Sequence, residues 1–122
     1  MPRVVHFELP ADDPDRAARF YSSVFGWKIE KWAGPMDYWM IATGGAEEPG
    51  IDGAIMRRQD PLSALNVTVD VPSVDDFAAR VLASGGKIIA PKTPVPGVGY
   101  LAYCQDTEGT IFGIMQSDET AK

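Results

Sequence analysis

His6 and Glu8 stand two residues apart near the start of the chain, and their side chains suit acid–base or hydrogen-bonding chemistry. His6 is the only histidine of the sequence. An imidazole titrates near neutral pH, so His6 can donate or accept a hydrogen bond or act as a general base. Glu8 can orient His6 or accept a proton from a substrate. We expect both to contact a ligand, and the sequence assigns no catalytic residue. The alternative is a pair of polar side chains on a solvated strand.

Residues 65–72 repeat the pattern of residues 5–10 at a spacing of 60 positions, and Asn66 is the counterpart of His6. Thr68 and Asp70 alternate with Asn66, so the three side chains share one face of a strand. Chemistry that needs two matched imidazoles is therefore absent. We predict Asn66 and Thr68 as further polar ligand contacts.

The sequence has more aromatic and methionine side chains than packing against two short helices requires. We expect some of them to line a ligand site or a subunit interface. The predicted ligand contacts of this kind are Trp39, Met56, Tyr103 and Met115. Plain packing in the core is the alternative for each. Cys104, the only cysteine, has no second histidine to activate it, so a buried, inert thiol is expected.

The first half has the pattern of a βαβββ unit. Residues 4–9 alternate as a strand that Pro10 ends, and Asp12, Asp13 and Pro14 begin a helix that Gly26 ends. Strands are predicted at residues 27–32, 38–42 and 53–56, with a glycine-rich loop at 44–50. The helix carries an apolar stripe, made up of Ala17, Phe20, Tyr21, Val24 and Phe25.

The second half repeats this order after a linker at residues 58–64. A strand at 65–71 precedes a helix that is capped by Ser73 and ended by Gly85 and Gly86. Strands are then predicted at 87–90, 100–105 and 111–116, with a loop at 91–99. We expect one domain of 122 residues, with modules at 1–57 and 65–116 and a tail at 117–122.

The apolar face of each first strand is expected to pack under the helix of its module. In the first module Val5, Phe7 and Leu9 would contact Phe20, Tyr21 and Val24. In the second module Val67, Val69 and Val71 would lie under Phe77 and Val81. The polar faces, with His6, Glu8, Asn66, Thr68 and Asp70, would then line a cleft between the modules.

The composition of the chain limits the kinds of partner that we expect. The net charge of −6, with 17 acidic and 11 basic residues, argues against nucleic acid as a ligand. No stretch is long and apolar enough for a membrane span, and the N-terminus lacks the pattern of a secretory signal. A single cysteine allows no internal disulfide. We expect a cytoplasmic protein without a membrane partner.

The chain resembles the glyoxalase/bleomycin resistance/dioxygenase superfamily, also called the vicinal oxygen chelate superfamily. The resemblance rests on three motifs in the right order: the strand at residues 6–9, the helix and its exit at 16–27, and the closing segment at 106–116. It implies an α+β fold of two paired βαβββ modules, with a curved sheet around a central cleft, and it favours a homodimer.

The resemblance also implies four metal-ligand positions, of which one keeps its ligand. His6 matches the first. The others fall on Asn66, on Ala54 or the adjacent Gly53, and on Gly113 in place of the usual glutamate. Because a tight divalent site needs at least about three protein donors, we predict no metal and no other cofactor. An unorthodox metal site of His6, Glu8 and Asp70 is the alternative.

The leading prediction is a protein that binds a small, partly aromatic organic molecule in the cleft without a complete metal site. A metal-dependent lyase, isomerase or dioxygenase of the glyoxalase type is the first alternative, which the resemblance keeps open. A ligand-free interaction module is the second.

Overall fold

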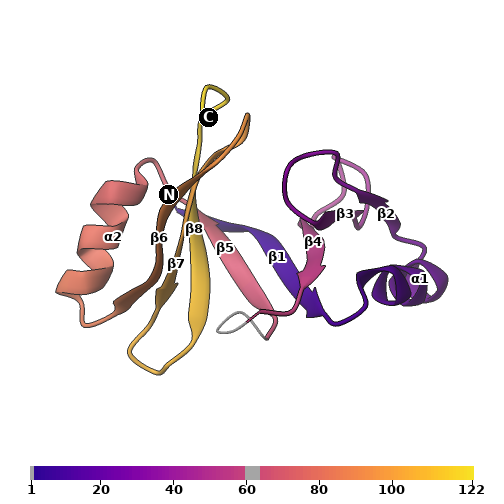
Figure 1. Cartoon of the computed structure of the whole chain (residues 1–122), viewed down its shortest axis with the longest axis horizontal. Coiled ribbons are helices and arrows are strands. Elements are labelled where there is room, and N and C mark those ends of the chain that lie inside the picture. Colours follow the sequence, from indigo (N-terminus) through magenta and orange to yellow (C-terminus); the bar gives the residue numbers. More distant parts are fainter. Residues whose placement is uncertain (1, 60–63) are drawn as a thin grey trace. The chain divides into compact units, whose positions relative to one another are not determined.

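The computed structural model of the chain describes residues 2–59 and 64–122. Its internal contacts divide it into two compact units, of which one is His6–Asn66 and the other joins the chain from Val67 onward to the residues before His6. Each unit contains four strands and one helix in the order βαβββ, which confirms the predicted α+β class and the duplication (Figure 1).

The first module forms a four-stranded sheet with one helix. Its strands lie in the order β2-β3-β4-β1, with β1 and β4 parallel and the other pairs antiparallel. The elements are β1 (Arg3–Ala11), α1 (Pro14–Phe25), β2 (Lys28–Lys31), β3 (Tyr38–Ala42) and β4 (Asp52–Arg57).

Helix α1 begins and ends where its capping residues predict. The side chain of Asp13 accepts a hydrogen bond from the backbone N–H of Arg16 at 3.1 Å, which satisfies one of the free donors of the first turn. Gly26 ends the helix with φ = 72°, a left-handed conformation that glycine adopts without a steric penalty.

The core of the first module lies between α1 and the sheet. Ile41 and Ile55 are buried there, and they pack with Leu9 and Tyr21. The expected contact of the whole apolar stripe was wrong. Phe20 and Val24 are 59% and 54% exposed, and Val5 is exposed at the start of β1. Ala17, Ala18 and Tyr21 supply the helix side of the core instead.

The second module has the same construction. Its strands lie in the order β5-β8-β7-β6, and the Ser73 hydroxyl caps α2 by accepting the N–H of Asp76 at 3.1 Å. Figure 1 shows α2 alongside the strands of its own sheet. The elements are β5 (Asn66–Asp70), α2 (Val74–Ala83), β6 (Lys87–Val95), β7 (Gly99–Gln105) and β8 (Ile111–Ser117).

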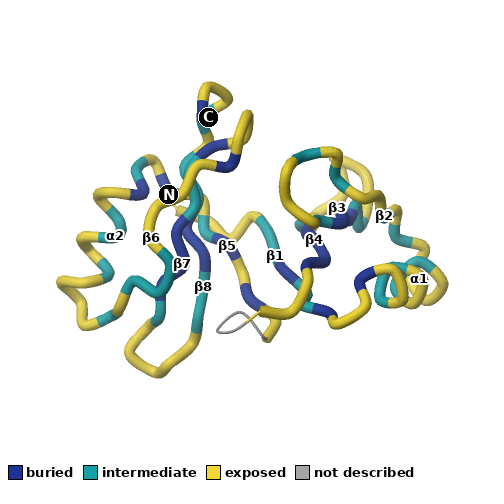
Figure 2. The backbone as a smooth tube through the Cα atoms, in the orientation of Figure 1, coloured by how far each residue is buried: buried dark blue, intermediate teal, exposed yellow. Residues whose placement is uncertain are grey.

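The core of the second module matches the sequence pattern in part. Val69, Val71 and Phe77 pack against buried Ile114 and Cys104, as the alternation of β5 indicates. Val67 is exposed, so its predicted position under the helix was wrong. In Figure 2 the buried residues follow β7 and β8 through the middle of this sheet.

Two predicted boundaries need correction. Strand β1 continues through Pro10 to Ala11, because the backbone of Ala11 still has a partner: its carbonyl accepts the N–H of Arg58 at 3.0 Å. Strand β6 continues through residues 91–95, which were predicted as a loop, and β6 tolerates Pro91 and Pro94 because it is an edge strand with irregular pairing. Most of the predicted linker, residues 60–63, lies outside the described residues.

The tail after β8 is held by the turn between β6 and β7. Asp118 donates its N–H to the carbonyl of Val98, and Gly97 donates to the carbonyl of Ala121. Ala121 is buried as a result.

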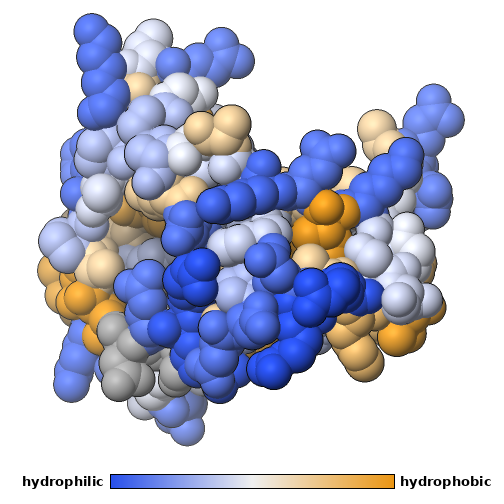
Figure 3. All heavy atoms as spheres, turned by 45° about the vertical axis from the view of Figure 1, so that its right-hand side comes forward, coloured by the Kyte–Doolittle hydropathy of each residue, from blue (hydrophilic) through white to orange (hydrophobic). Residues whose placement is uncertain are grey.

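Among the described residues, no helix is long and apolar enough to cross a membrane. Hydrophilic residues dominate the surface seen in Figure 3, and apolar patches are separate and small.

Candidate functional site

One face of the first-module sheet carries the polar residues that the sequence singles out. The core residues Phe7, Leu9 and Ile55 face α1, so the alternate residues point to the opposite face. Strand pairing aligns Glu8 with Ala54 and Tyr38 with Met56 on that face. We call the face that bears His6, Glu8, Tyr38, Met40, Ala54 and Met56 the polar face of the first module.

Glu8 and Tyr38 form the tightest polar contact on this face. The Tyr38 hydroxyl donates a hydrogen bond to Glu8 Oε2 at 2.6 Å, and Glu8 is 2% exposed. Burial of a carboxylate away from water is costly unless hydrogen bonds compensate it, and a short O–H···O bond is of the strong kind. The pair is therefore a fixed part of the fold rather than a solvated surface feature.

His6 lies two residues before Glu8 on β1 and shares its face of the sheet. Burial lowers the pKa of its imidazole below the ordinary value of 6.5, although the nearby carboxylates of Glu8 and Asp52 act in the opposite direction. Neutral imidazole therefore dominates at pH 7, with one nitrogen that donates and one that accepts. His6 pairs with Asp52 in the register of β1 and β4.

Asp52 is already engaged at its own end of the sheet. Its Oδ1 atom accepts a hydrogen bond from the Thr43 N–H at 2.8 Å and another from the Thr43 hydroxyl at 3.2 Å. These bonds hold the end of β3 against β4. The Asp52 carboxylate therefore raises the pKa of His6 through its charge, while its Oδ1 atom stays hydrogen-bonded to Thr43.

Trp39, a predicted ligand contact, lies on the other side of this sheet. It packs in the core with Ile41 and Ile55, and its Nε1 donates to Asp15 Oδ1 of α1 at 3.0 Å. The cations of Lys31 and Arg57 lie 5.4 and 5.6 Å from its ring centre. Trp39 is thus separated from the polar face by the sheet, and it has no place in a site built on His6 and Glu8.

Tyr38 takes the place that sequence reasoning gave to Trp39. The signal was present in the sequence, because alternation along residues 38–42 puts Tyr38 and Met40 on one face and Trp39 and Ile41 on the other. Tyr38 was not predicted as a site residue because the sequence alone does not fix which face of β3 turns toward α1.

In the second module, Thr68 and Tyr103 lie on the face of the sheet opposite α2, and both are buried. They converge on Gly113. A Cβ atom at this glycine would meet Thr68 Oγ1 at 3.2 Å and Tyr103 Cε1 at 3.5 Å. Met115 lies two residues further along the same strand, paired with Asp70. Three predicted contacts thus share one face of their own module.

Asn66 is the other predicted contact, and its amide is incompletely satisfied. Its Nδ2 donates to the carbonyl of Ala64 at 3.4 Å, whereas its buried Oδ1 has no hydrogen-bond partner among the described residues. Asn66 is 5% exposed. An unpaired buried acceptor costs about 1–3 kcal/mol, so a donor that reaches this oxygen would be favoured.

The four positions that resemblance assigns to a metal do not fit one. Ala54 is buried and has no donor atom, and the space beside Gly113 is taken by Thr68 and Tyr103. Glu8, which the unorthodox set requires, already accepts the Tyr38 hydroxyl. Within residues 2–59 and 64–122, no three histidine, cysteine, aspartate or glutamate side chains form a group that could hold a metal ion.

Cys104 lies in the core of the second module and is fully buried. Burial raises the pKa of its thiol above the ordinary value, which disfavours the reactive thiolate. The predicted burial of Cys104 is confirmed, and the inertness of its thiol stays a prediction.

Comparisons with known proteins agree with the fold. Residues 3–44 match the family model described as bleomycin resistance protein-like N-terminal. A putative glyoxylase, CFP32, of Mycobacterium tuberculosis is 32% identical over 116 residues, which cover 89% of this chain and 42% of the relative. The chain thus spans about two-fifths of the length of that curated relative. A glyoxylase-like domain-containing protein of Didymella fabae is 29% identical over 112 residues, with 88% of each chain covered.

Solved structures share the fold at low sequence identity. Methylmalonyl-CoA epimerase of Streptomyces coelicolor, in complex with 2-nitronate-propionyl-CoA, matches with a TM-score of 0.70 and 15% identity over 98% of this chain and 97% of its own. A superfamily member from Vibrio splendidus, described as glyoxalase/bleomycin resistance protein/dioxygenase, matches with a TM-score of 0.67 and 20% identity, over 97% of this chain and all of its own.

Proposed function

This chain belongs to the glyoxalase/bleomycin resistance/dioxygenase superfamily, and we propose that it binds a small, partly aromatic organic molecule on the polar face of its first module without a complete metal site. The observation that carries the proposal is the Tyr38–Glu8 hydrogen bond of 2.6 Å beside a half-buried, neutral His6. His6 is the polar group offered to the ligand, and the buried Glu8–Tyr38 pair fixes its surroundings.

The roles of the three polar groups follow from their protonation and partners. Neutral His6 presents one donor and one acceptor, so it can recognise a hydroxyl, an amide or a ring nitrogen. Glu8 and Tyr38 hold each other in place, and Glu8 also acts on His6 through its charge. None of these roles requires a bound metal ion.

The apolar part of the ligand would meet methionines on the same face. Met56 pairs with Tyr38, and Met40 pairs with Ala54, so both lie beside the polar groups. Thioether sulfurs make favourable contacts with aromatic rings, each worth about 0.3–1.5 kcal/mol. This combination of soft apolar surface and a few fixed polar groups is typical of sites for small organic molecules.

The second module carries predicted contacts on a face of its own sheet. Thr68, Tyr103 and Met115 share one face of their sheet, and Asn66 offers an unsatisfied oxygen. Their contact with a ligand is a separate prediction, which variants at each of the four positions test in the same thermal-shift screen.

A metal-dependent enzyme is the second candidate. It is favoured by the alignment of His6 with Asp52 in neighbouring strands, which brings two possible metal donors together. Against it stands the use of Asp52 Oδ1 by Thr43. Elemental analysis of the purified protein decides between the two: stoichiometric zinc, nickel, iron or manganese that is lost in His6→Ala would establish the second candidate.

The first candidate is tested by a thermal-shift screen of aromatic compounds that carry hydrogen-bonding groups, on protein treated with a chelator. We expect at least one compound to raise the melting temperature in a concentration-dependent way, and His6→Ala to abolish that shift. Glu108→Gln, a change in the exposed turn between β7 and β8, is the matched control and should bind as the parent does. Stabilisation that persists in His6→Ala would remove His6 from the site.

A further inference from the structure

We propose a second small-molecule site in the first module, at the junction of β1 and α1, which binds an aromatic carboxylate. The two elements flank an open cavity of about 600 Å³, within the range of roughly 300–1,000 Å³ that is usual for ligand pockets. It lies on the α1 side of β1, because Leu9 lines it and packs toward the helix. The sheet separates it from the polar face of the first module.

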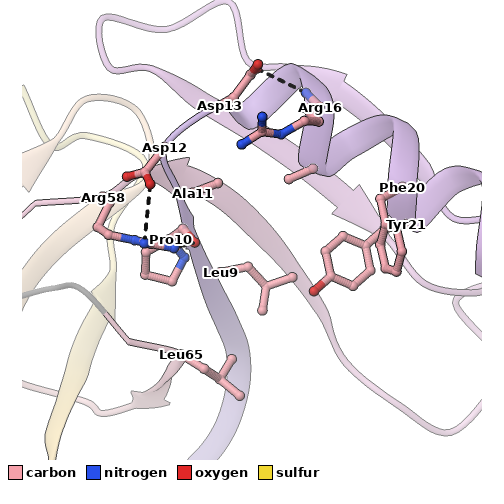
Figure 4. A pocket seen from close by; sticks show the side chains of 11 residues that line it. Leu9, Pro10, Ala11, Asp12, Asp13, Arg16, Phe20, Tyr21, Arg58 and Leu65 are labelled. Carbon is pink, nitrogen blue, oxygen red and sulfur yellow. Dashed lines mark hydrogen bonds and ion pairs between the residues drawn. The ribbon is translucent and has the colours of Figure 1, made fainter.

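The apolar wall of this cavity includes an aromatic surface that the fold leaves uncovered. Phe20 is 59% exposed, and it stands edge-on to Tyr21 with ring centres 5.2 Å apart. Leu9 points toward the Tyr21 ring in Figure 4. A flat ring that enters here would bury the Phe20 face and gain an aromatic contact. Leu65 and Ala17 complete the apolar wall.

The charges around the cavity leave one cation without a partner. Arg58 pairs with Asp12 at 3.4 Å, and its guanidinium lies 3.5 Å from the carbonyl of Pro10. Asp13 is used as the cap of α1, where it accepts the backbone N–H of Arg16. The guanidinium of Arg16 makes no ion pair or hydrogen bond with any residue in the described parts of the chain.

Arg16 therefore determines the class of ligand. A guanidinium presents two parallel N–H groups that match the two oxygens of a carboxylate. The carboxylates of Asp12 and Asp13, which also line the cavity, oppose any anion, but they oppose a phosphate dianion about twice as strongly as a monocarboxylate. An acid with one aromatic ring system fits both the cation and the apolar wall.

The test uses 2-naphthoate, titrated into the full chain and followed by two-dimensional amide NMR. We expect saturable shifts at the amides of Leu9, Arg16 and Tyr21. The affinity should fall at least about tenfold for the neutral analogue 2-naphthamide and for Arg16→Gln, because each loses the charge-assisted hydrogen bonds. Arg19→Gln is the matched control, since Arg19 lies on the same helix, is exposed, and does not line the cavity.

Phe20→Ala distinguishes the contribution of the apolar wall to the affinity from that of the Arg16 cation. It should weaken both naphthoate and naphthamide, whereas Arg16→Gln should weaken naphthoate alone. Equal affinity of the parent and Arg16→Gln for naphthoate would overturn the proposal. So would shifts confined to His6 and Tyr38, and that outcome would leave the proposed function on the polar face standing, because His6→Ala tests it separately.

Discussion

Tyr38→Phe removes one hydroxyl, and the structure allows its cost to be worked out. The hydroxyl donates a 2.6 Å hydrogen bond to Glu8, which is 2% exposed, so water cannot easily replace the lost donor. A hydrogen bond to a charged group contributes about 1.5–3 kcal/mol, and loss of one partner leaves a buried acceptor short of a donor. Glu8 has a further interaction in the fold, so we take the lower value, about 1.5 kcal/mol.

For a chain of 122 residues, a loss of about 1.5 kcal/mol lowers the melting temperature by roughly 5–9 °C. Differential scanning calorimetry and urea unfolding both measure it. The contact of the Tyr38 ring with Trp32, at 6.1 Å between centres, is kept in Tyr38→Phe. The hydroxyl of Tyr100 has no hydrogen-bond partner among the described residues, so Tyr100→Phe is the matched control and should stay within about 0.5 kcal/mol of the parent.

A double-mutant cycle with Glu8→Gln measures the coupling free energy between Glu8 and Tyr38. We expect the effects of Tyr38→Phe and Glu8→Gln to be non-additive, because Tyr38→Phe breaks the hydrogen bond whose acceptor loses its charge in Glu8→Gln. If Tyr38→Phe is as stable as Tyr100→Phe, or if the two changes simply add, then the Glu8–Tyr38 bond does not organise the polar face and the reasoning built on it fails.

Three other predictions concern single groups. His6 should titrate below pH 6.5, which NMR of its ring protons measures. Because the unfolded chain binds this proton at a higher pH than the folded chain does, the free energy of unfolding should decline as the pH falls from 6.5 through the folded-state pKa. His6→Gln should remove that part of the decline. Cys104 should resist a thiol reagent in the native protein at pH 8 and react in urea, because it is fully buried and its pKa is raised; rapid native labelling would contradict this. Gly99→Ala should cost more than about 2 kcal/mol by urea unfolding, because the new Cβ would collide with the backbone carbonyl of Gln116, whereas at Gly45 the nearest atom is 3.7 Å away and Gly45→Ala should change little.

Local signals predicted the elements well where they rest on backbone chemistry. Asp13 and Ser73 cap the two helices as their side chains indicate, and Gly26 ends the first helix in a left-handed conformation. These signals act within a few residues, so they are readable without knowledge of the fold. The order of helix and strands along each module agrees with the duplication that the sequence shows.

Burial was predicted less well, because it depends on how far a helix reaches over its sheet. Phe20 and Val24 lie in the apolar stripe of α1, yet they stay exposed, while Ala18, outside the stripe, packs against the core. The prolines of β6 predict a loop, but an edge strand tolerates their missing backbone donors.

The candidate site shows the same division. Alternation placed His6 and Glu8 on one face without help from the structure. The hydrogen bond from Tyr38 joins residues 30 positions apart, and only the register of β3 and β4 puts Tyr38 rather than Trp39 on that face. The free guanidinium of Arg16 was equally hidden, because Asp12 pairs with Arg58, a residue 46 positions away in the sequence.

The central claim is that the polar face binds an organic molecule without a metal ion. Isothermal titration of the best stabilising compound into chelator-treated protein, with and without added zinc, nickel or manganese, tests it most directly. We predict the same dissociation constant in all conditions for the parent and no measurable binding for His6→Ala. Binding that appears only when a divalent metal is added, or that is unchanged in His6→Ala, would contradict the account.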